Sequence, residues 1–409
     1  MTATCAPMAA PLAPPAHGLA RASCVLAIFS ALLGSTAPSP LYPIYLERLH
    51  AGHGTGTVIY AMYTLGTLAA LLLSARLGGR IGDLRRVILP GLVITALGAL
   101  IFARADTLAM LLVGRGLNGV GTGLIAGLAT SALYDLAPAG RRAQAAMIAT
   151  VAFTAGAAGG PLLSSAALAA DAAPTVTPFV VIALSASLAF AGLMRADWPQ
   201  PAENRAGTVT EDTAPELPGR TDVAPYVLGC LAITAAWMLG SQLMAMGSML
   251  AQEVYGVRSA GLAGLIPAIF QISAGAGQAL FGRFAPRRPV GLGLAAMAAA
   301  QLGLVLAVPG AHGTAMFVLI AGCGLAYGAV FVGGLGLVNA AAAPARRAAL
   351  VSRFYIVGYL ANAVPAMLVG VLSDRLGLAE AFVLFSAALM AVALFSAGFA
   401  HRLGRRAPL

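Results

Sequence analysis

One arginine lies deep inside an apolar stretch of the chain. Arg115 falls about eight residues into the apolar run 108–134, which is roughly 12 Å along a helix. A charge at that depth in hydrocarbon costs on the order of several kcal/mol unless it faces a cavity or a partner. Asn118 lies one helical turn further on and shares its face. Arg115 could therefore act in proton coupling or bind anionic groups, or its guanidinium could reach the surface or be held by backbone carbonyls.

The chain offers few other groups for catalysis or metal binding. None of the fourteen acidic residues lies in the middle of an apolar run, and the nearest, Glu47 and Asp135, stand at run ends. The five histidines lie in or beside polar connections or tails, and the four cysteines are dispersed without a C-x-x-C pair. We therefore predict no metal site, no disulfide and no cofactor. The sequence also lacks H-E-x-x-H and G-x-x-x-x-G-K-[ST], which argues against a membrane-embedded enzyme and an ATP-driven pump.

The segments that position Arg115 must be surrounded mostly by lipid. Hydrophobic residues make up 59% of the 409 residues and charged residues 9%, whereas a soluble domain carries about 25% charged residues. This composition excludes a soluble domain, a disulfide scaffold, a coiled coil and a disordered protein. Twelve runs are long enough to span a bilayer, and they are 22–46, 56–77, 87–105, 108–134, 143–168, 176–194, 224–251, 259–281, 290–309, 314–340, 348–371 and 380–400.

The runs divide into two sets of six. The longest polar stretch of the chain, rich in Pro, Glu, Asp and Thr, separates the sixth run from the seventh and is typical of a linker. We predict an all-α membrane protein in five parts: a disordered tail at 1–20, a six-helix bundle at 21–195, a linker at 196–222, a second six-helix bundle at 223–401 and a tail at 402–409.

The basic residues indicate how the chain is oriented. All 24 are arginines, clustered between the apolar runs without interleaved aromatic residues, so we expect no nucleic-acid partner. The side that carries both termini and the even-numbered connections receives 19 arginines, and the other side receives four. Because positive charge accumulates on the cytoplasmic side, we expect both termini in the cytoplasm and a multi-pass protein of a bacterial-type inner membrane.

The two sets of six runs also repeat each other. When the chain is shifted by 203 residues, the arginine-rich octet 79–86 falls on the octet 282–289, and each follows the second run of its half. Arg141 and Arg142 open the fifth run of the first half, and Arg346 and Arg347 open the fifth run of the second half. Repeated halves with a site between them near the bilayer midplane are typical of transporters.

Over about residues 20–400, the chain resembles the major facilitator superfamily of secondary transporters. The loop motif of that family, Gly-x-x-x-Asp followed by arginines, matches Gly79 and Asp83 with Arg85 and Arg86, although this copy is about two residues shorter and lacks the second internal glycine. The fourth-span motif, Arg-x-x-(Gln/Asn)-Gly, matches the segment that starts at Arg115.

A third motif lies in the fifth span. The family pattern Gly-x-x-x-Gly-Pro-x-x-Gly-Gly matches Gly156, Gly160 and Pro161, but Ser164 and Ser165 replace the last two glycines. In the family this motif accompanies efflux antiporters. The residues themselves favour close helix packing, and the resemblance adds a hinge in this helix.

The resemblance implies two further sites. Gly79, Asp83, Arg85 and Arg86 would form a cytoplasmic gate in which Asp83 faces a helix N-terminus of the other half only when the cytoplasmic side is closed. The substrate cavity would be lined by polar, largely uncharged side chains, although each of them could instead make an interhelical hydrogen bond. The candidates are Tyr42, Tyr63, Asn118, Trp237, Ser241, Gln242, Gln271, Gln278, Tyr327, Asn339, Tyr355 and Asn362.

These observations favour a secondary transporter that works by alternating access, with two six-helix bundles related by a pseudo-twofold axis. Proton-coupled export of a small amphipathic or drug-like solute ranks first, because of the fifth-span motif. Uptake or exchange of a neutral or anionic metabolite follows, because Arg115 lies inside a span and no acidic residue does. A non-transporting membrane sensor on the same fold stays open. We expect a monomer whose partners are its solute, protons and the lipid bilayer.

Overall fold

The computed structural model describes residues 17–77, 83–198, 222–310, 313–343 and 346–406. Within these residues it contains helices and no strand, and twelve helical spans are long and apolar enough to cross a membrane. The twelve predicted spans are therefore confirmed, with boundaries that differ by a few residues. Gly79 and most of the predicted linker and tails lie outside the described residues.

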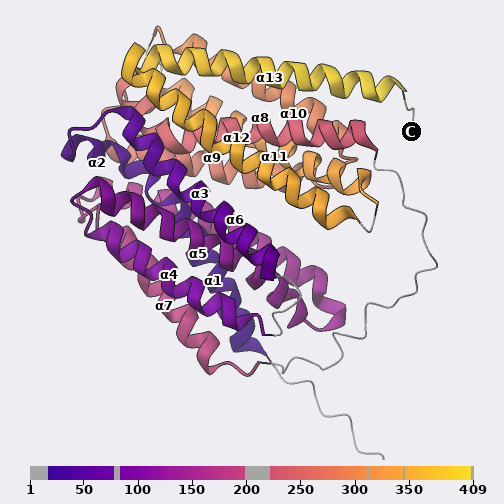
Figure 1. The fold of residues 1–409 in the computed structure, drawn as a ribbon. Coiled ribbons are helices and arrows are strands. Elements are labelled where there is room, and N and C mark those ends of the chain that lie inside the picture. Colours follow the sequence, from indigo (N-terminus) through magenta and orange to yellow (C-terminus); the bar gives the residue numbers. More distant parts are fainter. Residues whose placement is uncertain (1–16, 78–82, 199–221, 311–312, 344–345, 407–409) are drawn as a thin grey trace, which may run out of the picture.

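The first half consists of six spans (Figure 1). The first span is divided into α1 (Gly18–Thr36), the 3₁₀ turn η1 (Ser39–Leu41) and α2 (Tyr42–Arg48). The other five spans are α3 (His53–Leu77), α4 (Arg85–Ala103), α5 (Leu108–Asp135), α6 (Arg142–Ala169) and α7 (Thr177–Arg195), with a short turn η2 (Ala139–Arg141) before α6.

The second half repeats this order. Its first span is α8 (Val223–Met249), extended by a π-helical turn η4 (Leu250–Val254). The following spans are α9 (Ala260–Phe281), α10 (Arg287–Ala307), α11 (Gly313–Ala341), α12 (Arg347–Leu376) and α13 (Leu378–Arg406). Helix α13 thus continues into the segment predicted as the C-terminal tail, and α1 begins at Gly18, inside the predicted N-terminal tail.

The packing of the helices confirms the duplicated architecture. In the first bundle α1 contacts α5, α6 and α7, and in the second bundle α8 contacts α11, α12 and α13 in the same way. The bundles meet along two seams, α3 against α12 and α6 against α9, which exchange under the pseudo-twofold operation. Figure 1 shows the first bundle in indigo to magenta and the second in salmon to yellow.

The helices run between two opposite ends of the molecule. The far end carries residues 47–57, 250–261 and 370–378, and the near end carries residues 83–85, 136–142 and 283–288, together with the start of α1 and the end of α13. In Figure 1 α2 lies at the far end, on the left, and the last turns of α13 lie on the right.

The first span is interrupted by its prolines. Pro38 and Pro40 cannot donate a backbone hydrogen bond, so α1 ends at Thr36 and the chain continues as a single 3₁₀ turn in which the Leu41 N–H bonds to the Pro38 carbonyl. The hydroxyl of Ser164 on α6 donates to the Ala37 carbonyl at 2.7 Å. A carbonyl freed by the break is thereby satisfied inside the molecule, as hydrocarbon surroundings require.

The glycines of the fifth-span motif bring α6 against α1. A Cβ atom at Gly156 would lie 2.5 Å from the Phe29 carbonyl oxygen, and one at Gly160 would lie 2.6 Å from that of Leu33. Helix α6 runs from Arg142 to Ala169 without a break at Pro161. The packing role expected from small residues is therefore the one visible in this state, and the hinge stays a prediction.

We expect Gly160→Ala to destabilise the protein by about 1–3 kcal/mol, because the added methyl group forces α1 and α6 apart. Gly127→Ala on α5 is the matched control, since nothing lies within 4 Å of its added Cβ, and it should leave stability unchanged or slightly raised. Thermal denaturation in detergent checks both variants. Equal stability of the two would contradict the packing role of Gly160.

Candidate functional site

Arg115 lies on α5, and its side chain is fully buried. Its Nη1 atom donates to the carbonyl oxygen of Ser35 at 2.7 Å. Ser35 is in the last turn of α1, where carbonyl oxygens lack intrahelical partners and the helix dipole is negative. Of the alternatives that the sequence leaves open, the structure therefore shows the guanidinium held by a backbone carbonyl.

That single hydrogen bond does not satisfy the guanidinium. Its Nε and Nη2 atoms make no hydrogen bond to the described part of the chain, although the Tyr42 hydroxyl lies nearby. The charge lies over the ring of Tyr63, 4.7 Å from the centroid, and less closely over the ring of Tyr60. Asn118 is also fully buried, and neither polar atom of its amide has a partner among the described residues. A bound ligand or water molecule could accept hydrogen bonds from these unsatisfied buried donors.

Tyr60 connects this buried charge to the other bundle. Its hydroxyl accepts a hydrogen bond of 3.0 Å from the Nδ2 atom of Asn362 on α12. The Oδ1 atom of the same amide accepts a hydrogen bond of 2.8 Å from the Thr64 hydroxyl on α3. The α3–α12 seam therefore contains a polar link between the bundles, one aromatic ring away from Arg115.

An aromatic cluster lies next to this link. Trp237 on α8 contacts Tyr359 on α12 edge to face, with ring centroids 4.8 Å apart, and the ring of Tyr355 is 6.5 Å from Trp237. The hydroxyl of Tyr359 is close enough to those of Tyr63, Tyr355 and Tyr327 to interact electrostatically. We define the aromatic cluster as Tyr63, Trp237, Tyr327, Tyr355 and Tyr359. The indole Nε1 of Trp237 is buried and has no partner among the described residues.

Other predicted cavity residues lie elsewhere. Gln242 is buried in a hydrogen-bonded network with Gln301 on α10 and Ser386 on α13, entirely inside the second bundle. The hydroxyl of Ser241 donates to a carbonyl of its own helix, and the amide of Asn339 does the same on α11. Gln271 and Gln278 are partly exposed on α9. Interhelical or local hydrogen bonds thus account for three of these side chains.

Asp83 forms its contacts within its own half. Its carboxylate accepts the backbone N–H of Arg85 at 2.9 Å and pairs with the guanidinium of the same residue at 3.2 Å. Arg85 in turn lies over the ring of Trp198 at 5.2 Å, and Arg86 is exposed. Among the residues described, the ion pair of Asp83 is with Arg85 and none joins it to α12, so the gate at a closed near end stays a prediction.

The far end, in contrast, carries polar contacts between the bundles. His53 on α3 pairs with Glu253 of η4, and the backbone N–H of Gly54 donates to both carboxylate oxygens of Asp374 on α12. Sequence reasoning missed these residues, as well as Tyr60 and Tyr359. Charged residues at the ends of two spans and a tyrosine every three to four residues along two helices were the available signals, but they do not show which helices are neighbours.

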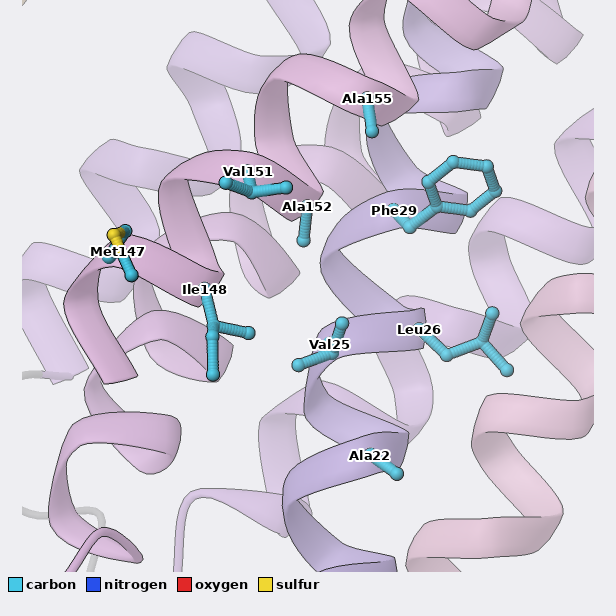
Figure 2. A pocket seen from close by; sticks show the side chains of 9 residues that line it. All are labelled: Ala22, Val25, Leu26, Phe29, Met147, Ile148, Val151, Ala152 and Ala155. Atoms are coloured by element: carbon cyan, nitrogen blue, oxygen red, sulfur yellow. The ribbon is translucent and has the colours of Figure 1, made fainter. Parts of the chain in front are cut away.

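An apolar groove lies apart from these polar residues. It runs between α1 and α6 in their near-end halves (Figure 2) and is lined by side chains such as Leu26, Phe29, Met147 and Val151. Met147 and Val151 are among the most exposed apolar side chains of the molecule. A groove of this composition offers no polar group for solute recognition, so the candidate site remains the region of Arg115 and the aromatic cluster.

Comparison with known proteins identifies the family. Residues 24–366 match the sequence model of the Major Facilitator Superfamily. The chain belongs to this superfamily of transporters. A comparison with curated protein sequences finds no match.

Solved structures of transporters share the fold at low sequence identity. A bacterial homologue of the human lysosomal transporter Spinster superposes with a TM-score of 0.72 and 16% identity, covering 96% of this chain and 98% of that one. A POT family transporter in complex with 5-aminolevulinic acid gives a TM-score of 0.74 and 14% identity, covering 94% and 96%. A variant of the nucleoside transporter NupG gives a TM-score of 0.70 and 12% identity, covering 93% and 100%.

We expect Arg115→Met to change the free energy of unfolding by less than about 1 kcal/mol. The lost hydrogen bond to Ser35 is offset because a charge with unsatisfied donors no longer has to be buried. Arg258→Met, at an exposed arginine of the far end, is the control. A loss of 3 kcal/mol or more, measured by denaturation in detergent, would show that Arg115 mainly holds the end of α1 (roughly the cost of breaking a required buried charge interaction).

Proposed function

We propose that the protein is a secondary active transporter that works by alternating access. The observation that supports this is the asymmetry of the bundle contacts: polar groups join the bundles at the far end, whereas Asp83 at the near end pairs within its own half. With the near end toward the cytoplasm, as the arginine distribution predicts, this state would be closed to the outside. The Asp83 gate would form when the bundles rock to the opposite state.

We further propose that the solute is a small amphipathic, uncharged aromatic molecule exported in exchange for protons. The aromatic cluster offers ring faces and edges on which a planar ring can stack, and the free indole N–H of Trp237 offers a hydrogen bond to a polar substituent. The described mid-span residues include no acidic side chain, and the charge beside Tyr63 is positive. An organic cation would meet repulsion and no counter-charge there.

A counterflow assay in proteoliposomes tests this proposal with three aromatic probes of different charge: neutral chloramphenicol, cationic ethidium and anionic salicylate. Neutral chloramphenicol should accumulate only with protein, and more strongly when a pH gradient is imposed, whereas cationic ethidium should not accumulate. Failure of chloramphenicol to exchange would contradict the proposed solute class, and exchange that is indifferent to the pH gradient would contradict proton coupling.

The unsatisfied guanidinium of Arg115 favours a second candidate, the carriage of an organic anion. Salicylate in the same counterflow assay distinguishes the two. Exchange of salicylate that is abolished by Arg115→Met, together with no exchange of chloramphenicol, would support the anion carrier instead of the exporter of uncharged solutes.

We expect Tyr359→Ala to lower the exchange of chloramphenicol about five- to thirtyfold, because the cluster loses the ring that contacts Trp237 and with it about 1–2 kcal/mol of stacking and apolar contact. Tyr134→Ala is the matched control, since Tyr134 is an exposed tyrosine near the end of α5 that contacts Arg142. Equal exchange rates of the two variants would place the solute elsewhere.

A further inference from the structure

A histidine at the far end has a carboxylate of the second bundle near each of its two ring nitrogens. His53 is the first residue of α3, and its Nε2 atom lies 3.1 Å from the nearer carboxylate oxygen of Glu253. Its Nδ1 atom lies 3.9 Å from Oδ1 of Asp374. Glu253 belongs to η4 and Asp374 to α12, so one imidazole of the first bundle stands between two carboxylates of the second.

The charge of the imidazole decides how strongly this site joins the bundles. A neutral imidazole donates from one ring nitrogen only, whereas an imidazolium donates from both and carries a positive charge. Only the protonated form can therefore pair with both carboxylates at once. The three side chains are between one quarter and one half exposed, so water and protons reach them.

Among the described residues, no arginine of the neighbouring elements forms an ion pair with Glu253 or Asp374. The groups that act electrostatically on His53 are Glu253 and Asp374. The other charged or titratable groups of the far end form no ion pair with His53 in the described structure. They are Glu47 and Arg48 on α2, His50 in the following turn, Arg104 and Asp106 between α4 and α5, Asp171 between α6 and α7, Arg258 before α9, Arg375 on α12 and Glu380 on α13.

Asp374 also holds the seam in a way that does not depend on the proton. Both oxygens of its carboxylate accept the N–H of Gly54, at 3.2 and 3.1 Å, at the positive N-terminal end of α3. A Cβ atom at Gly52 or Gly54 would collide with this carboxylate, so the close approach requires glycine. A proton on His53 would therefore strengthen a contact between the bundles that the Gly54–Asp374 hydrogen bonds already make.

We propose that His53 is a proton-binding site that controls the far end of the transporter. Proton binding favours the state in which the bundles meet there, and proton release favours the state in which they separate. This role does not depend on which solute is carried, because it concerns only the equilibrium between the two states.

Distance measurements between spin labels test the proposal on the whole protein in nanodiscs. The background has Cys5, Cys24, Cys230 and Cys323 changed to alanine, and the labels are attached through Arg48→Cys and Arg258→Cys, two exposed far-end positions in different bundles. Between about pH 8 and about pH 5.5, on either side of the range in which histidine titrates, the ratio of far-end-closed to far-end-open molecules should rise about two- to fivefold, as for a partly exposed ion pair.

Three variants test whether the pH response comes from His53. His53→Gln keeps a side-chain donor but binds no proton, so its ratio should not change with pH. His50→Asn alters the nearby exposed histidine, whose positive φ of 50° asparagine tolerates, and should keep the response of the parent. Glu253→Gln, at a half-exposed position, should reduce the response and serves if His53→Gln fails to fold.

The proposal is overturned if the parent ratio does not change with pH, if acid opens the far end, or if His53→Gln or Glu253→Gln responds like the parent. No solute is needed for this measurement. A protein that shows the pH response but exchanges none of the three aromatic probes would contradict the proposed function and leave the proton site standing.

Discussion

The free carbonyl oxygens at the end of α1 impose a constraint that several other features satisfy. Prolines break the first span within the apolar layer, and the carbonyls they release cannot turn to water. Arg115 of α5 supplies a donor to Ser35, and Ser164 of α6 supplies one to Ala37. Ser164 stands where the family motif has a glycine, and a glycine could not make this hydrogen bond. The break, the buried charge and the altered motif are one arrangement.

That arrangement lies beside the groups that connect the two bundles. The guanidinium lies over Tyr63 and Tyr60, and Tyr60 reaches Asn362 of the second bundle. A change at the charge, such as the arrival of a solute or a proton, would alter contacts on the α3–α12 seam without any intermediate element. The seam continues to the far end, where Gly54 meets Asp374. The proposed binding near the centre and the proposed closure at the far end would thus be linked along one helix, α3.

The sequence predicts the fold far better than it predicts the site. The twelve spans follow from apolar length, because that signal depends only on residues that are close in the chain, and the structure confirms them. The orientation given by the arginine counts stays a prediction. The sequence allows a hydrogen bond from Arg115 to a backbone carbonyl, but it does not identify Ser35 as the partner. That partner depends on the residue at which α1 ends. The sequence predicts that the Gln242 side chain lines the substrate cavity, but the rotation of α8 about its axis directs this side chain toward Gln301 and Ser386. His53 looked like a solvated turn residue, because Glu253 and Asp374 are about 200 and 320 residues away in the sequence.

The network of Gln242, Gln301 and Ser386 has a consequence for how the protein is made. These side chains come from the first, third and last spans of the second bundle. When α8 enters the bilayer during synthesis, the amide of Gln242 lacks its hydrogen bond to Ser386, which is synthesised about 140 residues later. The second bundle therefore reaches its final arrangement only after the last helix is inserted. In a chain truncated before α13, the amides of Gln242 and Gln301 would keep only the hydrogen bond to each other.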